Sequence, residues 1–162
     1  MKDVNEKEKK VFVVPKEEAV FWLDAYGRWH NKHGVFEHKK IISHFHSSIR
    51  KDADGYYLFQ KHNDHTIEKV YFKYEDTALF VFDVNIQDDS DKIRLILNTK
   101  DEIPLTPENL FVQNDNLYMK HAGHRIKFLD RAMMKLAHRL KFNQNRYCIE
   151  LNDKTYDIPI RI

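Results

Sequence analysis

A chain of 162 residues can form one domain or two small ones, and its 42% hydrophobic and 13% aromatic residues exclude an intrinsically disordered protein. The formal net charge of +2 excludes a polybasic or polyacidic tail as the basis of function. After residue 110 the chain has ten Lys or Arg against five Asp or Glu, so a mild basic bias lies in its second half.

The N-terminal residues and the single cysteine bear on the cellular location. Residues 1–10 are charged and lack an apolar stretch, so no secretory signal is predicted. No apolar run approaches the roughly 20 residues that a membrane-spanning helix needs. Cys148 is the only cysteine, which rules out an internal disulfide and fits a reducing compartment. We therefore expect a cytoplasmic protein without a membrane span.

The local patterns predict short strands with two helices among them. Apolar residues recur at helical spacing in 39–49 and in 131–140, whereas the other apolar segments alternate or are rich in Val, Ile, Leu and Phe. In the first part of the chain we expect a strap at 1–20 with a strand at 11–14, a hairpin at 21–30 turning at Gly27, a helix at 39–49, and strands at 56–59, 66–72, 77–86 and 92–98 with an acidic loop at 88–91. A connector follows at 101–108. After it we expect strands at 110–112, 117–120 and 124–128, a helix at 131–140, and two closing strands from 146.

Sequence features of the first half recur in the second half in the same order. The apolar faces of the two helices correspond at an offset of 91 residues, and two Asn-Asp-x-Thr turns correspond at 89. Because the same order recurs within two residues of register, we predict a duplicated strand–helix–strand–strand unit. The expected fold class is α+β, with two small antiparallel-sheet subdomains. The expected division is a strap at 1–20, a first repeat at 21–100 and a second repeat at 101–162.

Several short segments together resemble a bacterial family catalogued as domain of unknown function 1285. The resemblance covers about residues 20 to 160, and its order and spacing carry it rather than any one segment. The proline of the family's Val-Glu-Asp-Ala-Pro-Phe segment is replaced by Leu79. The matching segments are Asp24-Ala25-Tyr26-Gly27-Arg28-Trp29, His33-Gly34-Val35, the helical residues 45–49, Asp54-Gly55-Tyr56-Tyr57-Leu58, residues 74–80, residues 98–102, Leu105-Thr106, and residues 118–126.

The resemblance implies a duplicated fold whose second half is similar to a pleckstrin-homology-type barrel. It also implies a groove between the halves that holds a nucleotide-like ligand in a signalling role. The family has no established reaction, so the resemblance implies no catalytic residues.

The residues themselves indicate neither a metal centre nor a nucleophile. Zinc takes three or four convergent ligands, whereas the chain has one cysteine and its histidine pairs are three residues apart, so the two side chains of a pair in a strand point to opposite faces. Cys148 alternates with apolar neighbours in a predicted strand, which favours a buried thiol. Exposed histidines, no metal, no cofactor and no enzymatic activity are therefore predicted, with an unrecognised enzyme as an alternative. The histidine pairs are His30 and His33, His62 and His65, and His121 and His124.

A small anionic ligand, possibly a nucleotide in signalling, is the leading functional hypothesis, with the site in the cleft between the two repeats. Arginine binds phosphate with two parallel hydrogen bonds, and carboxylates can orient ligand hydroxyls. The simpler interpretation of each acid is a local cap or ion pair, and large aromatic residues in strands usually belong to the core. The predicted ligand-binding residues are Trp29, Asp76, Asp101, Tyr118, Arg125 and Arg131.

A protein- or nucleic-acid-interaction module is the alternative function, although nucleic acid is the less favoured partner. Arg131, Lys135 and Arg139 are four residues apart, so they form one stripe on the second predicted helix. An anionic macromolecule would bind such a stripe. The simpler interpretation is the solvated face of an amphipathic helix.

Overall fold

The structure, a computed structural model, describes residues 9–87 and 92–162 and divides into two compact units, the first ending at Asp76 and the second beginning at Thr77. The expected strap at 1–20 is thus described from Lys9 onward, and the expected acidic loop at 88–91 lies outside the described residues. The units divide earlier than the expected boundary after residue 100, because β9 (Leu79–Gln87) pairs in parallel with β14 (His124–Phe128) of the second unit.

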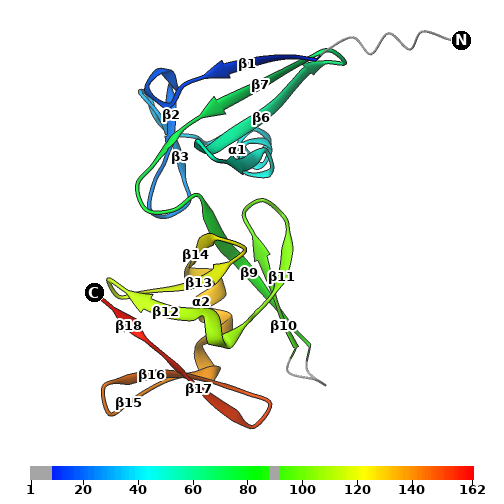
Figure 1. The fold of residues 1–162 in the computed structure, drawn as a ribbon. Helices are drawn as coiled ribbons and strands as arrows, with labels where there is room; N and C mark the ends of the chain where they lie inside the picture. The colour runs from blue at the N-terminus through cyan, green and yellow to red at the C-terminus, as the bar shows by residue number, and fades with distance from the viewer. Residues whose placement is uncertain (1–8, 88–91) are drawn as a thin grey trace, which may run out of the picture. The chain divides into compact units, whose positions relative to one another are not determined.

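The first unit consists of two four-stranded sheets and one helix. The sheets have the strand orders β4-β3-β2-β8 and β1-β7-β6-β5, and Figure 1 shows β1, β7 and β6 side by side. The strands β2, β3 and β4 form one antiparallel meander, and β5, β6 and β7 form another. Strand β8 pairs in parallel with β2. The elements are β1 (Lys10–Val14), η1 (Lys16–Glu18), β2 (Phe21–Leu23), β3 (Trp29–Asn31), β4 (Gly34–Val35), α1 (Lys39–Ser47), β5 (Ile49–Asp52), β6 (Gly55–Asn63), β7 (Thr66–Tyr71) and β8 (Lys73–Tyr74).

Helix α1 ends two residues earlier than the sequence predicts. The imidazole of His38 accepts a hydrogen bond from the Ile41 amide at 3.4 Å and caps the start of the helix. At the end, the Ser48 hydroxyl donates to the carbonyl of His44 at 2.6 Å. Ile49 then begins β5, a strand that the sequence analysis did not anticipate because Ile49 also continues the helical spacing.

An aromatic cluster forms the core of the first unit. The ring of Trp29 is 1% exposed and packs at steep angles against Phe21, Phe45 and Phe72, with centroid distances from 5.0 to 5.8 Å. Its indole N–H donates to Nδ1 of His46 at 3.2 Å. Edge-to-face packing of aromatic rings adds to the stabilisation from burial. The cluster therefore fixes α1 against the sheet that contains β2 and β3.

The second unit consists of a seven-stranded sheet, a three-stranded sheet and one helix. The strand orders are β11-β10-β9-β14-β13-β12-β18 and β15-β16-β17. The terminal strand β18 returns to pair in parallel with β12, and Figure 1 shows α2 next to β9. The other elements are β10 (Lys92–Leu97), β11 (Glu102–Pro104), η2 (Pro107–Asn109), β12 (Leu110–Gln113), β13 (Asn116–His121), α2 (Asp130–Leu136), η3 (Ala137–Arg139), β15 (Leu140–Asn143), β16 (Arg146–Leu151), β17 (Lys154–Ile158) and β18 (Ile160–Arg161).

Three hairpins of the second unit turn on pairs of non-glycine residues with positive φ. These pairs are Asn114-Asp115, Gln144-Asn145 and Asn152-Asp153, with φ between 49° and 62°. Two-residue turns of this kind match the twist of the flanking strands, and Asn and Asp tolerate the conformation. The expected turn at Asn152 is thus present. The expected turn at Asn63 is also present, at Asp64 and His65 between β6 and β7, and there Oδ1 of Asn63 accepts a hydrogen bond from the His65 amide at 2.8 Å.

The fold is mostly β with two short helices and several small sheets, in agreement with the predicted α+β class. No sheet closes into a barrel within the two described segments, so the expected pleckstrin-homology-type barrel is not seen as a closed structure. None of the helices in the described part of the chain is long and apolar enough to cross a membrane.

Candidate functional site

The six predicted ligand-binding residues fall in both units and differ in burial. Trp29 belongs to the aromatic core of the first unit, where its indole nitrogen already has a partner in His46. Asp76 is half-buried in the bend that precedes β9. Asp101 is exposed in the turn between β10 and β11 and accepts a hydrogen bond from the Thr99 hydroxyl at 2.8 Å. Their role in binding stays a prediction.

Tyr118 and Arg125 are brought into contact by neighbouring strands of the second unit. The guanidinium of Arg125 lies 4.1 Å from the centroid of the Tyr118 ring, which is 1% exposed. The same guanidinium donates to Oε1 of Gln113 at 3.1 Å. The ring of Phe111 on β12 stacks on the ring of Tyr118, with their centroids 5.3 Å apart. The guanidinium of Arg161 lies 4.0 Å from the centroid of the Phe111 ring. Two guanidinium groups and two stacked rings thus form one continuous cation–π arrangement.

The predicted basic stripe on the second helix is partly neutralised. Lys135 forms an ion pair with Asp83 of β9, with Nζ 2.6 Å from Oδ1. The Lys135 hydrogen bond holds the pKa of the Asp83 carboxyl below its usual range, with a smaller contribution from the charge of Arg131. Arg131 is exposed, whereas Arg139 is half-buried in η3. The stripe therefore serves partly to fasten α2 to β9, which weakens the polyanion-binding alternative.

The titratable residues form no metal centre in the described segments. No group of three or more His, Cys, Asp or Glu side chains within residues 9–87 and 92–162 could hold a metal ion. Cys148 is a free cysteine and is buried, as its position in the predicted strand indicated. His62 contacts Glu68 and His30 contacts Asp24, each through Nε2, at 2.6 and 2.7 Å.

The second unit contains an apolar cavity that the sequence analysis did not predict. Its volume is about 460 Å³. It lies between the helical segment of α2 and η3, the β12–β13 hairpin, and the three-stranded sheet. Its lining residues are Val112, Asp115, Asn116, Leu117, Met133, Met134, Ala137, Leu140, Lys141, Phe142, Tyr147 and Ile158.

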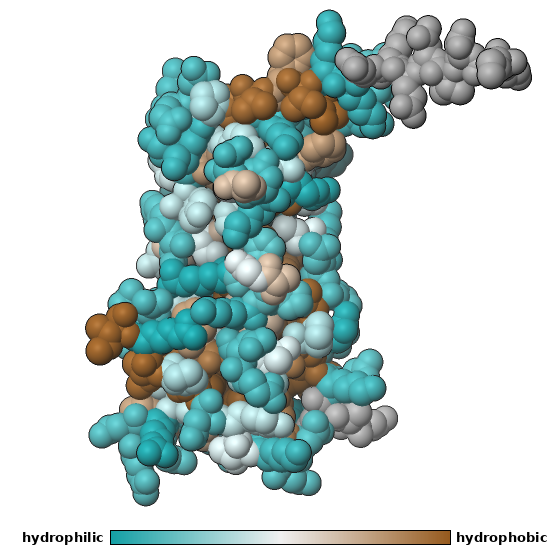
Figure 2. Space-filling view, in the orientation of Figure 1, coloured by the Kyte–Doolittle hydropathy of each residue, from teal (hydrophilic) through white to brown (hydrophobic). Residues whose placement is uncertain are grey.

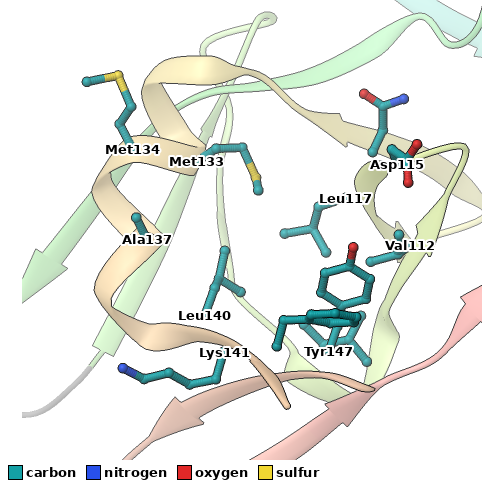
Figure 3. A pocket seen from close by; sticks show the side chains of 12 residues that line it. Val112, Asp115, Leu117, Met133, Met134, Ala137, Leu140, Lys141 and Tyr147 are labelled. Atoms are coloured by element: carbon teal, nitrogen blue, oxygen red, sulfur yellow. The ribbon is translucent and has the colours of Figure 1, made fainter. Parts of the chain in front are cut away.

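The side chains of the cavity separate into an apolar interior and a polar margin. Figure 3 shows Met133 extending inward, whereas Met134 and Lys141 extend away from the cavity. The ring of Tyr147 stands among the apolar side chains, next to Phe142 at a centroid distance of 4.5 Å. Its hydroxyl has no protein hydrogen-bond partner among the residues that the structure describes. The cavity thus offers an apolar surface with one hydroxyl for a hydrogen bond.

The fold defines an α+β protein built of two sheet-based units. No family model and no curated protein matches the chain. Among solved structures, the chain is similar to a DUF1285 family protein from Silicibacter pomeroyi DSS-3, with a TM-score of 0.63 and 13% identity, covering 97% of this chain and 86% of that one. It is also similar to a DUF1285 family protein from Shewanella baltica OS155, with a TM-score of 0.54 and 16% identity, covering 76% of this chain and 94% of that one.

The fold is therefore the one that the DUF1285 proteins have, and the resemblance identified from the sequence is confirmed at the level of the fold. The similar proteins are named by a domain of unknown function, so they assign no ligand and no reaction.

Proposed function

We propose that the protein is a non-catalytic ligand-binding protein whose second unit takes a small, largely apolar molecule. The apolar cavity between α2, the β12–β13 hairpin and the three-stranded sheet carries this proposal. Pockets for small molecules have volumes of roughly 300–1,000 Å³ and are lined mainly by apolar and aromatic side chains with a few polar groups. The volume of about 460 Å³ and the lining residues meet both conditions.

A duplication of one ancestral unit accounts for the architecture and belongs to the same proposal. From η1 in the first unit and from η2 in the second, both units have the order of a 3₁₀ turn, three antiparallel strands, a helix, three antiparallel strands and a short return strand, with η3 added after α2. Strand β1 precedes this order in the first unit, and β9, β10 and β11 precede it in the second. Each return strand pairs in parallel with the strand that follows the 3₁₀ turn of its own unit, β8 with β2 and β18 with β12. Four elements begin 91 residues apart in the two units: Lys16 and Pro107, Lys39 and Asp130, Ile49 and Leu140, Gly55 and Arg146.

The same offset relates the cavity to a filled space in the first unit. His46 on α1 is 3% exposed, and its ring lies 5.6 Å from that of Trp29. The corresponding residue in the second unit is Ala137, which lines the cavity. A methyl group at this position leaves open the volume that an imidazole occupies in the first unit. Phe142 is 56% exposed and Met134 77% exposed along this lining, and apolar surface left open in this way is typical of a binding site.

The lining determines the expected ligand chemistry. An apolar body would contact Leu117, Met133 and Ile158, and a hydrogen-bonding group would pair with the Tyr147 hydroxyl. The ammonium of Lys141 extends away from the cavity, and Asp115 adds a negative charge at its margin, so an anionic molecule is disfavoured there.

A small anionic ligand, held by the six predicted residues, stays a separate prediction. Thermal shift against mono-, di- and cyclic nucleotides tests it, because a ligand at 100 times its dissociation constant adds roughly 2.7 kcal/mol of stability. A saturable increase in melting temperature that Arg125→Ala abolishes would support the anionic ligand. An unchanged melting temperature with every nucleotide would contradict this prediction.

We expect the neutral fluorophore N-phenyl-1-naphthylamine to bind the cavity and Ala137→Phe to weaken this binding about tenfold or more, because the new ring occupies the space of the probe. The measurement is a fluorescence titration of the purified protein. Ala137 is exposed toward the cavity, so we expect the larger side chain to be accepted without unfolding.

The matched control is His138→Phe, which places the same side chain on the adjacent exposed residue of η3, outside the cavity lining. This variant should bind the probe as the native protein does. Equal binding by the native protein and by a folded Ala137→Phe variant would contradict the assignment, as would a signal that never saturates. Circular dichroism and melting temperature establish that both variants are folded.

A further inference from the structure

The outer strand of one sheet in the first unit has an open edge. Strand β1 lies at the end of the order β1-β7-β6-β5 and pairs in parallel with β7 alone, from Lys10 opposite Thr66 to Val14 opposite Val70. An edge strand presents backbone N–H and C=O groups that can pair with another chain.

The side chains of β1 are apolar and exposed on both faces of the strand. Val11, Phe12 and Val13 are 49%, 55% and 57% exposed, and consecutive residues of a strand point to opposite faces. Figure 2 shows hydrophobic surface over β1. Such a combination of open backbone and exposed apolar side chains is the property that soluble proteins ordinarily avoid at a sheet edge.

The other sheet edges in the described segments carry protection that β1 lacks. Charged residues, proline or very short strands discourage pairing with other chains. Strand β1 has five residues without proline, and its one charged residue, Lys10, stands at its start. By contrast, β5 exposes Arg50 and Lys51, β11 contains Glu102 and Pro104, β15 exposes Lys141, β17 exposes Lys154 and Asp157, and β4, β8 and β18 have two residues each.

We propose that β1 pairs with β1 of a second copy of this chain in an antiparallel arrangement about a two-fold axis. Centred on Phe12, the pairing places Phe12 opposite its own counterpart and Val11 opposite Val13, so the apolar side chains of each face meet. An isologous contact of this kind is self-complementary. It joins two four-stranded sheets into one sheet of eight strands.

The charges at the two ends of β1 select this orientation. Lys9 and Lys10 are exposed at its start, whereas Lys16, Glu17 and Glu18, with a net negative charge, are exposed just beyond its end. An antiparallel pair brings the basic end of each copy to the acidic end of the other, whereas a parallel pair would bring like charges together.

Sedimentation equilibrium or light scattering of the full chain across a concentration series tests the pairing. We expect a concentration-dependent species of twice 19.6 kDa. Phe12→Asp should give a monomer at every concentration, because two carboxylates would face each other across the axis. Val20→Asp, which changes another exposed apolar residue outside the strand, should leave the dimer intact. A native protein that stays monomeric, or a dimer that Phe12→Asp does not affect, would overturn the proposal.

Oxidative cross-linking tests the register independently of affinity. Residues directly opposite in an antiparallel pair have Cα atoms about 4.5–5.5 Å apart, within reach of a disulfide. Two copies of the Phe12→Cys variant should therefore form a disulfide-linked dimer, whereas Lys10→Cys, which would face Val14, should not. Phe12 is exposed in the single chain, so we expect both variants to keep the native melting temperature. Equal cross-linking of the two variants would contradict the register and the pairing.

Discussion

Lowering the pH from 7 to 4 is expected to reduce the free energy of unfolding of the first unit by about 3 kcal/mol, because His46 is buried in its neutral form. Burial lowers the pKa of this histidine from 6.5 to about 4. Between these two values the unfolded chain binds a proton that the folded chain does not. The stabilisation is therefore complete above pH 6.5 and is lost as the pH falls toward 4.

The surroundings of His46 explain why the ring resists protonation. Its burial among the core side chains is the main cause, and a hydrogen bond with the Gly27 carbonyl opposes it in part. Because Nδ1 accepts the indole N–H of Trp29, the neutral ring carries its proton on Nε2. Protonation of Nδ1 would remove this acceptor and set two N–H groups against each other.

Denaturation by urea at a series of pH values, followed by tryptophan fluorescence, measures the effect. The two tryptophans of the chain, Trp22 and Trp29, both lie in the first unit, so their signal reports on that unit alone. His46→Gln keeps a hydrogen-bond donor and acceptor but does not titrate, and its stability should change little between pH 7 and pH 4.5. A native protein with the same flat profile as this variant would show that His46 is not the acid-sensitive group.

Asp24→Ala is expected to destabilise the first unit by about 3 kcal/mol, because it removes the shared acceptor of a buried hydrogen-bond network. The residue Asp24 is 3% exposed. Its Oδ1 accepts from the backbone amides of Tyr26 and Arg28, each at 2.9 Å, and its Oδ2 lies 2.9 Å from Nε of Arg28 and 2.7 Å from Nε2 of His30. Removal of the carboxylate leaves these donors unpaired around the turn at Gly27.

The lowered pKa of Asp24 also indicates that its carboxylate stabilises the folded first unit. Burial by itself would raise it, but the hydrogen bonds from His30, from the two backbone amides and from the Arg28 side chain together place it below 3.8. The stabilisation from this carboxylate is thus present above pH 3.8 and is lost below it, at more acidic pH than the effect of His46.

Glu75→Ala provides the matched control for Asp24→Ala. Oε2 of Glu75 also accepts a backbone hydrogen bond in this loop, from Ala25 at 3.0 Å, but the side chain is exposed, so its loss should cost less than about 1 kcal/mol. Urea denaturation at pH 7, followed by tryptophan fluorescence, compares the two variants. If the two substitutions lowered the free energy of unfolding equally, the burial of Asp24 would contribute nothing to the stability of the first unit.

Periodicity predicts where the helices and most strands lie, but it does not fix which helical face is buried. The apolar pattern places Ile41 on the buried face of α1, yet Ile41 is 45% exposed. The positions Ile42, Phe45, His46 and Ile49 have the same helical spacing, and they place His46 on the buried side. This pattern could have identified the buried histidine, which the assumption of exposed histidines excluded.

The strands and pairings that escaped prediction depend on contacts distant in sequence. Strands β5 and β15 begin at Ile49 and Leu140, which also fit the helical pattern, so no local signal separates them from the helices. The two-residue strands β8 and β18 are defined by their partners alone. The cavity was missed for a similar reason, since the spacing of Met133 identifies an apolar face but not the volume opposite it.

The return strands also determine the order in which the protein can mature on the ribosome. Because β8 pairs with β2, the sheet of the first unit lacks its last partner until Tyr74 has left the exit tunnel. It can then fold while the remaining residues are still being translated, since domains generally fold as units during synthesis. The second unit must wait for β18, which ends at Arg161, so its sheet is completed only after this strand has left the exit tunnel as well.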